Sequence, residues 1–157
     1  DDLANAVIVS PDAGRIRVAE KWSTKLGGCP LAFVHKTRDT TRPNVAVANR
    51  VVGEVAGKEC VLVDDMIDTA GTITEAIKVL TNAGAKKVIV AATHGILSDP
   101  AVRRLSESGA TEVVITDTLP VSAEKRFPSL TILSIAPLLA RAILEVFEDG
   151  SVTSLFT

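Results

Sequence analysis

Paired carboxylates followed by a loop of small residues form the stretch of this sequence best suited to chemistry. The apolar run 61–63 ends at Asp64 and Asp65, and Asp68 follows three residues later, directly before Thr69-Ala70-Gly71-Thr72. Carboxylates can hold sugar hydroxyls or a divalent cation. Backbone N–H groups and the positive end of a helix that begins at such a loop suit a phosphate. The stretch therefore predicts a site for a sugar phosphate that Mg2+ could join.

The elements that must position these groups follow from hydrophobic periodicity. Apolar runs bounded by polar or glycine-containing turns alternate with segments of helical spacing. This alternation predicts an α/β fold, a mostly parallel central sheet flanked by helices, with a flexible loop after the second strand at 40–49. We expect strands at 6–9, 31–34, 51–55, 60–63, 88–92, 113–116 and 130–133, and helices at 16–26, 73–83, 102–108 and 136–147.

Polar side chains recur at the ends of the predicted strands. Ligands of open α/β sheets bind outside the carboxyl ends of the strands, so these residues are expected to converge on one crevice. They are Asp12, Lys36, Asp64, Asp65, Asp68 and His94. Ser98-Asp99-Pro100 has the pattern of a helix entry, with a cap residue before a proline at the first helical position.

Composition limits the function classes. The 157 residues predict one domain, with 46% apolar and 23% charged residues, as in an ordinary globular protein. A net charge of -2 and 3% aromatic residues argue against nucleic-acid binding. No apolar run approaches the roughly 20 residues of a membrane span. Cys29 and Cys60 are interpreted as reduced core residues of a cytoplasmic protein, with a disulfide as the less favoured alternative. The start at Asp1, without methionine, suggests a piece of a longer chain.

Several familiar motifs are absent. No Gly-x-Gly-x-x-Gly follows a strand, so a Rossmann dinucleotide site is excluded. Residues 53–58 come one residue short of a Walker A loop, and Glu59 stands where a serine or threonine should bind magnesium. The two histidines and two cysteines are too scattered for a zinc site.

The central stretch resembles the PRPP-binding motif of the type I phosphoribosyltransferase fold. Four further segments, in the same order, are similar to the C-terminal half of the ribose-phosphate pyrophosphokinase (PRPP synthetase) family, whose members have two similar domains. These segments are Ser10-Pro11-Asp12-Ala13-Gly14, His35-Lys36-Thr37-Arg38, Thr93-His94-Gly95-Ile96 and the tail 151–156. The resemblance covers essentially the whole chain and implies a single ribose 5-phosphate-binding domain over 1–157.

The resemblance also assigns roles to individual residues. It implies that Asp64, Asp65, Asp68, Thr69, Ala70, Gly71 and Thr72, with Arg38, bind ribose 5-phosphate, the loop amides holding the 5-phosphate. Asp12 would bind magnesium, and Asp12, Ala13, Gly14 and Arg15 would form the pyrophosphate loop. Arg15 stands where the family commonly has a second glycine, so its side chain either adds a phosphate contact or fills space.

The resemblance implies that two cations are catalytic, which without it would be interpreted as solvated surface charges. Lys36 and Arg38 alternate on an extended segment, so both can face one site. The transition state of pyrophosphoryl transfer is highly anionic, and positioned cations stabilise it. His94 is interpreted as a structural hydrogen-bonding residue. Ser151 and Thr153 resemble a family segment that contributes to phosphate or nucleotide regulation, although a plain terminal strand fits the tail equally well.

The resemblance implies a Mg2+-dependent ribose-phosphate diphosphokinase. ATP and ribose 5-phosphate would be the substrates, PRPP and AMP the products, and the enzyme a homo-oligomer. ATP would be held partly by an N-terminal domain that this chain lacks, so the chain alone is expected to bind but not to turn over. A phosphoribosyltransferase and a non-catalytic regulatory homologue are the alternatives, with a receiver domain more remote.

Overall fold

The computed structural model describes residues 3–37 and 48–156. Within them the strands form one seven-stranded sheet in the order β3-β2-β1-β4-β5-β6-β7, parallel throughout except for the antiparallel β2–β3 pair. The mostly parallel α/β fold predicted from the sequence is therefore confirmed. The strands are β1 (Ala6–Ser10), β2 (Leu31–Thr37), β3 (Ala48–Val52), β4 (Glu59–Ile67), β5 (Lys87–Gly95), β6 (Glu112–Thr116) and β7 (Leu130–Leu133).

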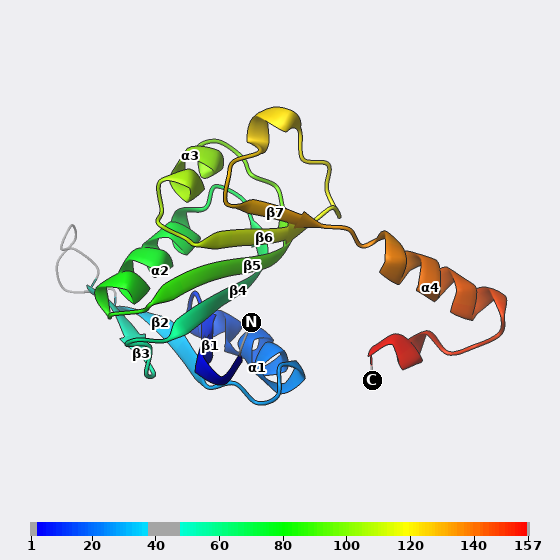
Figure 1. The fold of residues 1–157 in the computed structure, drawn as a ribbon, viewed down its shortest axis with the longest axis horizontal. Coiled ribbons are helices and arrows are strands. Elements are labelled where there is room, and N and C mark those ends of the chain that lie inside the picture. The colour runs from blue at the N-terminus through cyan, green and yellow to red at the C-terminus, as the bar shows by residue number, and fades with distance from the viewer. Residues whose placement is uncertain (1–2, 38–47, 157) are drawn as a thin grey trace.

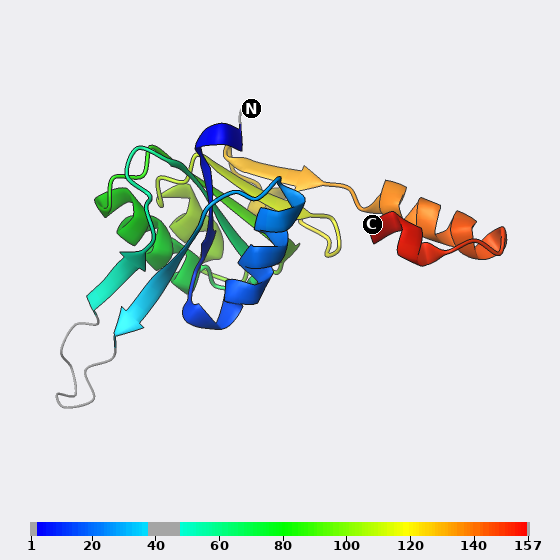
Figure 2. The ribbon, with the colours of Figure 1, turned by 90° about the horizontal axis from the view of Figure 1, so that it is seen from below.

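Helices cover both faces of this sheet (Figure 1, Figure 2). Helix α1 (Ile16–Lys25) packs on β1, β2 and β4, where Ala19 meets Ile8 and Val63 in a buried cluster. Helices α2 (Gly71–Asn82) and α3 (Ala101–Ser106) cover the opposite face, over the larger cluster that includes Leu62 and Ile77. The central strands are buried on both faces, which explains their continuous apolar runs.

The sheet reverses its winding direction between β1 and β4. From β1 the chain moves outward to β2 and β3, then returns to pair β4 with the other side of β1, Val9 lying opposite Leu62. Later strands are added outward from β4. Such a switch point leaves a crevice beyond the carboxyl ends of the two central strands. Asp12 follows one of these ends and Asp64 lies near the other.

Several boundaries differ from those predicted. The strand expected at 60–63 extends to Ile67, because its ladder with β5 continues to Gly95. Asp64 and Asp65 therefore lie within β4 rather than after it, and His94 lies within β5. The strand expected at 51–55 is wrong at both ends, since β3 spans Ala48–Val52 as the antiparallel partner of β2.

Two smaller predictions also need correction. Pro100 is the N-cap of α3 rather than its first residue, and no side-chain hydrogen bond caps that helix. The tail forms a 3-10 helix, η4 (Val152–Phe156), so a terminal strand is wrong. Cys29 and Cys60 are buried and free, as expected. Of the loop expected at 40–49, residues 40–47 lie outside the described part of the chain.

Helix α4 (Ala136–Phe147) projects away from the sheet in both views (Figure 1, Figure 2). None of its residues is buried, although most are apolar. Ile143 is 69% exposed and Phe147 is 86% exposed. Large exposed apolar patches mark interaction surfaces, so the exposed side of α4 is a candidate contact surface. No helix in the described part of the chain is long and apolar enough to cross a membrane.

Gly53 provides a test of the β2–β3 packing. Its φ is +112°, and a Cβ there would lie 2.8 Å from the Leu31 carbonyl oxygen and 2.9 Å from the Ala32 Cα. Because backbone atoms cannot move aside easily, Gly53→Ala is expected to lower the free energy of unfolding by about 2–4 kcal/mol. Gly57→Ala is the matched control, since its φ is +70° but its Cβ would meet nothing within 4 Å. We expect it to cost about 1 kcal/mol. Equal costs in urea denaturation would refute this account.

Candidate active site

Three segments converge on one cavity of about 250 Å3 at the switch point. The first follows β1 and contributes Asp12 and Arg15. The second is the end of β4 with its acid pair, and the third is the turn into α2. Together the lining contains four carboxylates and one guanidinium, from Asp12, Arg15, Asp64, Asp65 and Asp68, with Met66, Ile67 and residues 69–73. The structure thus brings Asp12 and Arg15 of the predicted pyrophosphate loop beside Asp64, Asp65 and residues 68–72 of the predicted ribose 5-phosphate set.

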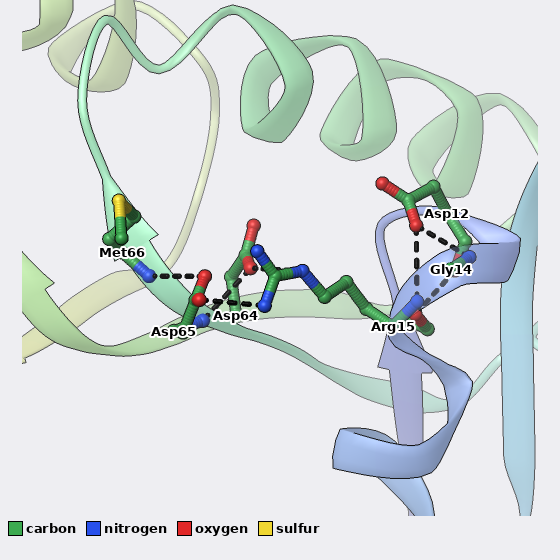
Figure 3. A network of polar contacts seen from close by, with 7 residues as sticks. Asp12, Gly14, Arg15, Asp64, Asp65 and Met66 are labelled. Carbon is green, nitrogen blue, oxygen red and sulfur yellow. Dashed lines mark hydrogen bonds and ion pairs between the residues drawn. The ribbon is translucent and has the colours of Figure 1, made fainter.

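Asp12 organises its own loop. It is the N-cap of the short 3-10 helix η2 (Ala13–Arg15), and its Oδ1 accepts hydrogen bonds from the amides of Gly14 at 2.8 Å and Arg15 at 3.2 Å (Figure 3). The Ser10 hydroxyl donates to the Asp12 carbonyl at 2.6 Å. Two amides of the predicted pyrophosphate loop, those of Gly14 and Arg15, therefore bond to the Asp12 carboxylate in this structure. The Arg15 side chain is the cationic group that this loop extends into the cavity.

The Arg15 guanidinium reaches across the cavity to the acid pair (Figure 3). Its Nη1 donates to Asp65 Oδ2 at 2.6 Å, and its Nε lies 3.8 Å from Asp64 Oδ1. The sequence left two roles open for this side chain, a phosphate contact or a space filler. In the structure it instead forms an ion pair with carboxylates 49 and 50 positions away in the sequence.

The two acids differ in environment. Asp64 is 13% exposed, and burial, reinforced by the neighbouring Asp65, raises the pKa of its carboxyl to about 6. Asp65 is 37% exposed. Its partial burial acts against ionisation, but hydrogen bonds from Asp64 and Arg15 lower the pKa of Asp65 below its usual value. The pair thus holds one carboxyl that is readily ionised and one that readily carries a proton.

The turn into α2 has the geometry of an anion site. Ala70 is the helix N-cap and takes a left-handed conformation with φ of 59°. Its carbonyl accepts hydrogen bonds from the Thr74 amide at 3.0 Å and the Thr74 hydroxyl at 2.9 Å, which closes the first helical turn. The amides of Gly71, Thr72 and Ile73 precede the first intrahelical bond, so a ligand can accept from them.

Arg104 is a site residue that sequence reasoning missed. It comes from α3, and its Nη1 donates to the carbonyl oxygen of Thr69 at 2.9 Å. The same guanidinium would lie 3.6 Å from a Cβ on Gly71, so it borders the predicted phosphate loop. No local pattern identified this residue, because the contact depends on how α3 packs beside α2.

The remaining predicted site residues do not line the cavity or lie outside the described part of the chain. Lys36 belongs to β2, but its side chain is not described, and Arg38 lies outside the described residues. His94 Nδ1 is 2.8 Å from the Thr118 hydroxyl, which fits the structural role expected of it. Ser151 and Thr153 are exposed and do not line the cavity, and the C-terminal segment lies beside α4, apart from the sheet (Figure 1). Their regulatory role stays a prediction.

The carboxylates that line the cavity can be compared with the ligands that Mg2+ prefers. Within 3–37 and 48–156, no three His, Cys, Asp or Glu side chains form a ready-made metal site. Mg2+ typically takes only one or two protein carboxylates, and waters and substrate phosphates supply the rest. The carboxylates of Asp12, Asp64 and Asp65 around one cavity fit an ion that arrives with a phosphorylated substrate. They do not fit a dedicated all-protein cage.

The buried carboxyl predicts a pH-dependent stability. Because the pKa of Asp64 in the folded state is about 6, above its ordinary 3.8, the native chain binds more protons between these values. The free energy of unfolding should therefore fall by roughly 2–3 kcal/mol from pH 4 to pH 7 through this group. Asp64→Asn should remove that slope in urea denaturation series. Asp117→Asn is the control. Hydrogen bonding lowers the pKa of that carboxyl, so its contribution to the free energy of unfolding rises with pH, and its removal should not abolish the fall caused by Asp64. A slope that survives in Asp64→Asn contradicts the assignment.

Known proteins resemble this chain along almost its whole length. Ribose-phosphate pyrophosphokinase from Bifidobacterium longum is 71% identical over 154 residues, which are 98% of this chain and 45% of that protein. The crystal structure of phosphoribosylpyrophosphate synthetase from Mycobacterium smegmatis superimposes with a TM-score of 0.84 at 62% identity, covering 93% of this chain and 46% of that one. This chain thus spans about half the length of these relatives.

A more distant structure agrees on the fold alone. Orotate phosphoribosyltransferase from Aeropyrum pernix superimposes over 94% of this chain with a TM-score of 0.55 and 21% identity. The α/β fold is therefore like that of the type I phosphoribosyltransferases. Residues 33–157 match the family described as the phosphoribosyl synthetase-associated domain. The chain belongs to the phosphoribosyl synthetase-associated domain family.

Proposed function

We propose that this chain is the ribose 5-phosphate-binding half of a ribose-phosphate pyrophosphokinase. The observation that carries the proposal is the single cavity shared by the acid pair, the turn into α2 and the Asp12 loop. A sugar phosphate needs an anion site at one end and hydroxyl acceptors at the other, and the cavity provides both. The similar enzymes from Bifidobacterium longum and Mycobacterium smegmatis carry names of this activity.

The ribose 5-phosphate would lie along the α2 entry. Its phosphate would accept hydrogen bonds from the amides of Gly71 and Thr72, at the positive end of α2. Its hydroxyls would donate to Asp64, Asp65 and Asp68, whose carboxylate oxygens act purely as acceptors when ionised. The 1-hydroxyl would then face the Asp12 loop on the other side of the cavity.

The reaction transfers the β,γ-pyrophosphoryl group of ATP. The 1-hydroxyl oxygen attacks the β-phosphorus, the bond from that phosphorus to the bridging α,β-oxygen breaks, and AMP leaves with this oxygen. The hydroxyl proton passes to solvent water as the new bond forms. The products are PRPP and AMP. Lys36 and Arg38, as predicted from the sequence, would stabilise the developing negative charge.

Magnesium would neutralise the pyrophosphoryl oxygens and orient them for in-line transfer. Asp12 is the residue proposed to hold it, because its second carboxylate oxygen is not used by the loop amides (Figure 3). The Asp12 loop would keep that oxygen oriented toward the cavity through its two amide hydrogen bonds. The acid pair lies across the same space.

The rest of the full-length polypeptide is the proposed partner of this half. The relatives are about twice as long as this chain, and α4 offers a large apolar surface that the described residues leave exposed. Ile143, Val146 and Phe147 are each at least 67% exposed on it. We place the contact with the remaining half on this helix, and a homo-oligomeric, cytoplasmic enzyme is part of the same proposal.

Turnover tests the proposed activity. In the full-length protein, Lys36→Ala should lower AMP release from ATP and ribose 5-phosphate by about 100-fold or more, because removing one transition-state donor typically costs that much. Lys58→Ala is the matched control, because Lys58 lies in the turn before β4, at the opposite end of that strand from the acid pair, and does not line the cavity. The 157-residue chain alone should bind ribose 5-phosphate without releasing AMP.

Other outcomes would point to the alternatives. Pyrophosphate release from PRPP that requires a nucleobase would establish a phosphoribosyltransferase. Unchanged turnover in Lys36→Ala would remove the catalytic role of that lysine, and a full-length protein that binds PRPP without any turnover would favour a regulatory homologue.

Assembly tests the partner proposal. Ile143→Glu with Phe147→Glu should weaken association of this chain with the separately produced remaining half by at least about tenfold, because charges would replace buried apolar anchors. Arg141→Gln, a polar change on the same exposed helix, should leave the affinity unchanged in calorimetric titration. Since α4 has no buried residue, circular dichroism of the double variant should match the parent. Undiminished association would exclude α4 as the contact.

A further inference from the structure

Arg15 connects the two ends of the proposed substrate cavity. It lies at the end of the η2 turn after β1, and its guanidinium binds the acid pair on β4 (Figure 3). The contact is short, with Nη1 2.6 Å from Asp65 Oδ2, and Nε stands 3.8 Å from Asp64 Oδ1. A single cation therefore faces both carboxylates at once.

The geometry favours a persistent pair over a chance surface contact. The Arg15 backbone is held at its own amide by Asp12 Oδ1, so the side chain starts from a fixed point. Asp65 is also held, because its Oδ1 accepts from the Met66 amide at 2.9 Å and its own amide donates to Asp64 Oδ1 at 2.9 Å. Fixed partners lose less conformational entropy on pairing than two free side chains do.

Without a cation, the acid pair is an unfavourable arrangement. Asp64 and Asp65 are adjacent in sequence, and Asp64 is mostly withdrawn from water. Two carboxylates so placed cannot both ionise easily unless a positive charge is near. Within the described residues, Arg15 is the only basic side chain that lines this cavity.

We propose that Arg15 is the resident counter-cation of the acid pair. It holds the two carboxylates in place beside the proposed sugar site before any metal arrives, and it competes with a divalent cation for them. Arg15 is thus a positioning residue for the sugar site. This inference rests on the proposed function for its sugar ligand, but its competition with a cation does not.

The first test measures the sugar site with and without metal. Ribose 5-phosphate is titrated into the 157-residue chain by calorimetry, once in EDTA and once in excess Mg2+. Arg15→Ala should weaken binding by about tenfold in EDTA, the loss of one charge-assisted contact, and by much less in Mg2+, which replaces the missing charge. Arg15→Lys should recover part of the EDTA affinity. Arg17→Ala, an exposed arginine two residues on, should behave as the parent in both buffers.

The second test needs no sugar. Mn2+ alone, followed by its paramagnetic broadening of the Asp64 and Asp65 amide resonances, should bind Arg15→Ala about tenfold more tightly than the parent, because the competing charge is gone. Matching amide spectra elsewhere would show that the variant folds.

The outcomes separate the two proposals. If the parent binds no ribose 5-phosphate in either buffer, the proposed function fails and the Mn2+ titration still decides the role of Arg15. Equal losses of sugar affinity with and without Mg2+ would show a purely structural role. Unchanged Mn2+ affinity in Arg15→Ala would overturn the counter-cation proposal outright.

Discussion

The parallel pairing of β1 with β4 is the constraint on which the rest of the site depends. These strands are about fifty residues apart in sequence, and their ladder places the turn after β1 beside the end of β4. Because of this pairing, Arg15 reaches Asp64 and Asp65, and Asp12 lines the same cavity. The ladder itself is secured by side chains buried on both faces, such as Ile8 and Leu62, which no polar substitution could replace without cost.

The cavity combines two opposite electrostatic surfaces within a short distance. The entry to α2 presents amide hydrogens and the positive end of a helix, whereas the end of β4 presents carboxylates. A neutral ligand gains from only one of these surfaces, while a molecule with a phosphate at one end and hydroxyls at the other gains from both. Arg15 lines the cavity and binds the acids, whereas Arg104 lies outside its lining and donates to the Thr69 carbonyl.

Sequence reasoning predicted the parts of this structure that depend on local pattern. Apolar runs placed the central strands, and the loop from Asp68 to Thr72 predicted the entry to α2, because helix entry is a local property. The long-range contacts were not predictable. Arg15 was placed on the correct loop, but its pairing with Asp65 depends on strand order. The contact of Arg104 depends on how two helices pack. The full length of β4 follows from its ladder with β5, which extended the strand through residues that look polar and exposed.

The exposed helix α4 has a consequence for how such a protein would fail in a cell. The sheet buries its own core without this helix, so folding of the body and covering of α4 are separate events. A substitution on α4 would leave the chemistry of the cavity intact, yet lengthen the time during which an apolar surface is open to proteases and chaperones. A decrease of about 1–2 kcal/mol in the free energy of unfolding can change the abundance of a protein in the cell several-fold, because unfolded chains are degraded. Variation on this helix would therefore appear as too little protein rather than as an altered cavity.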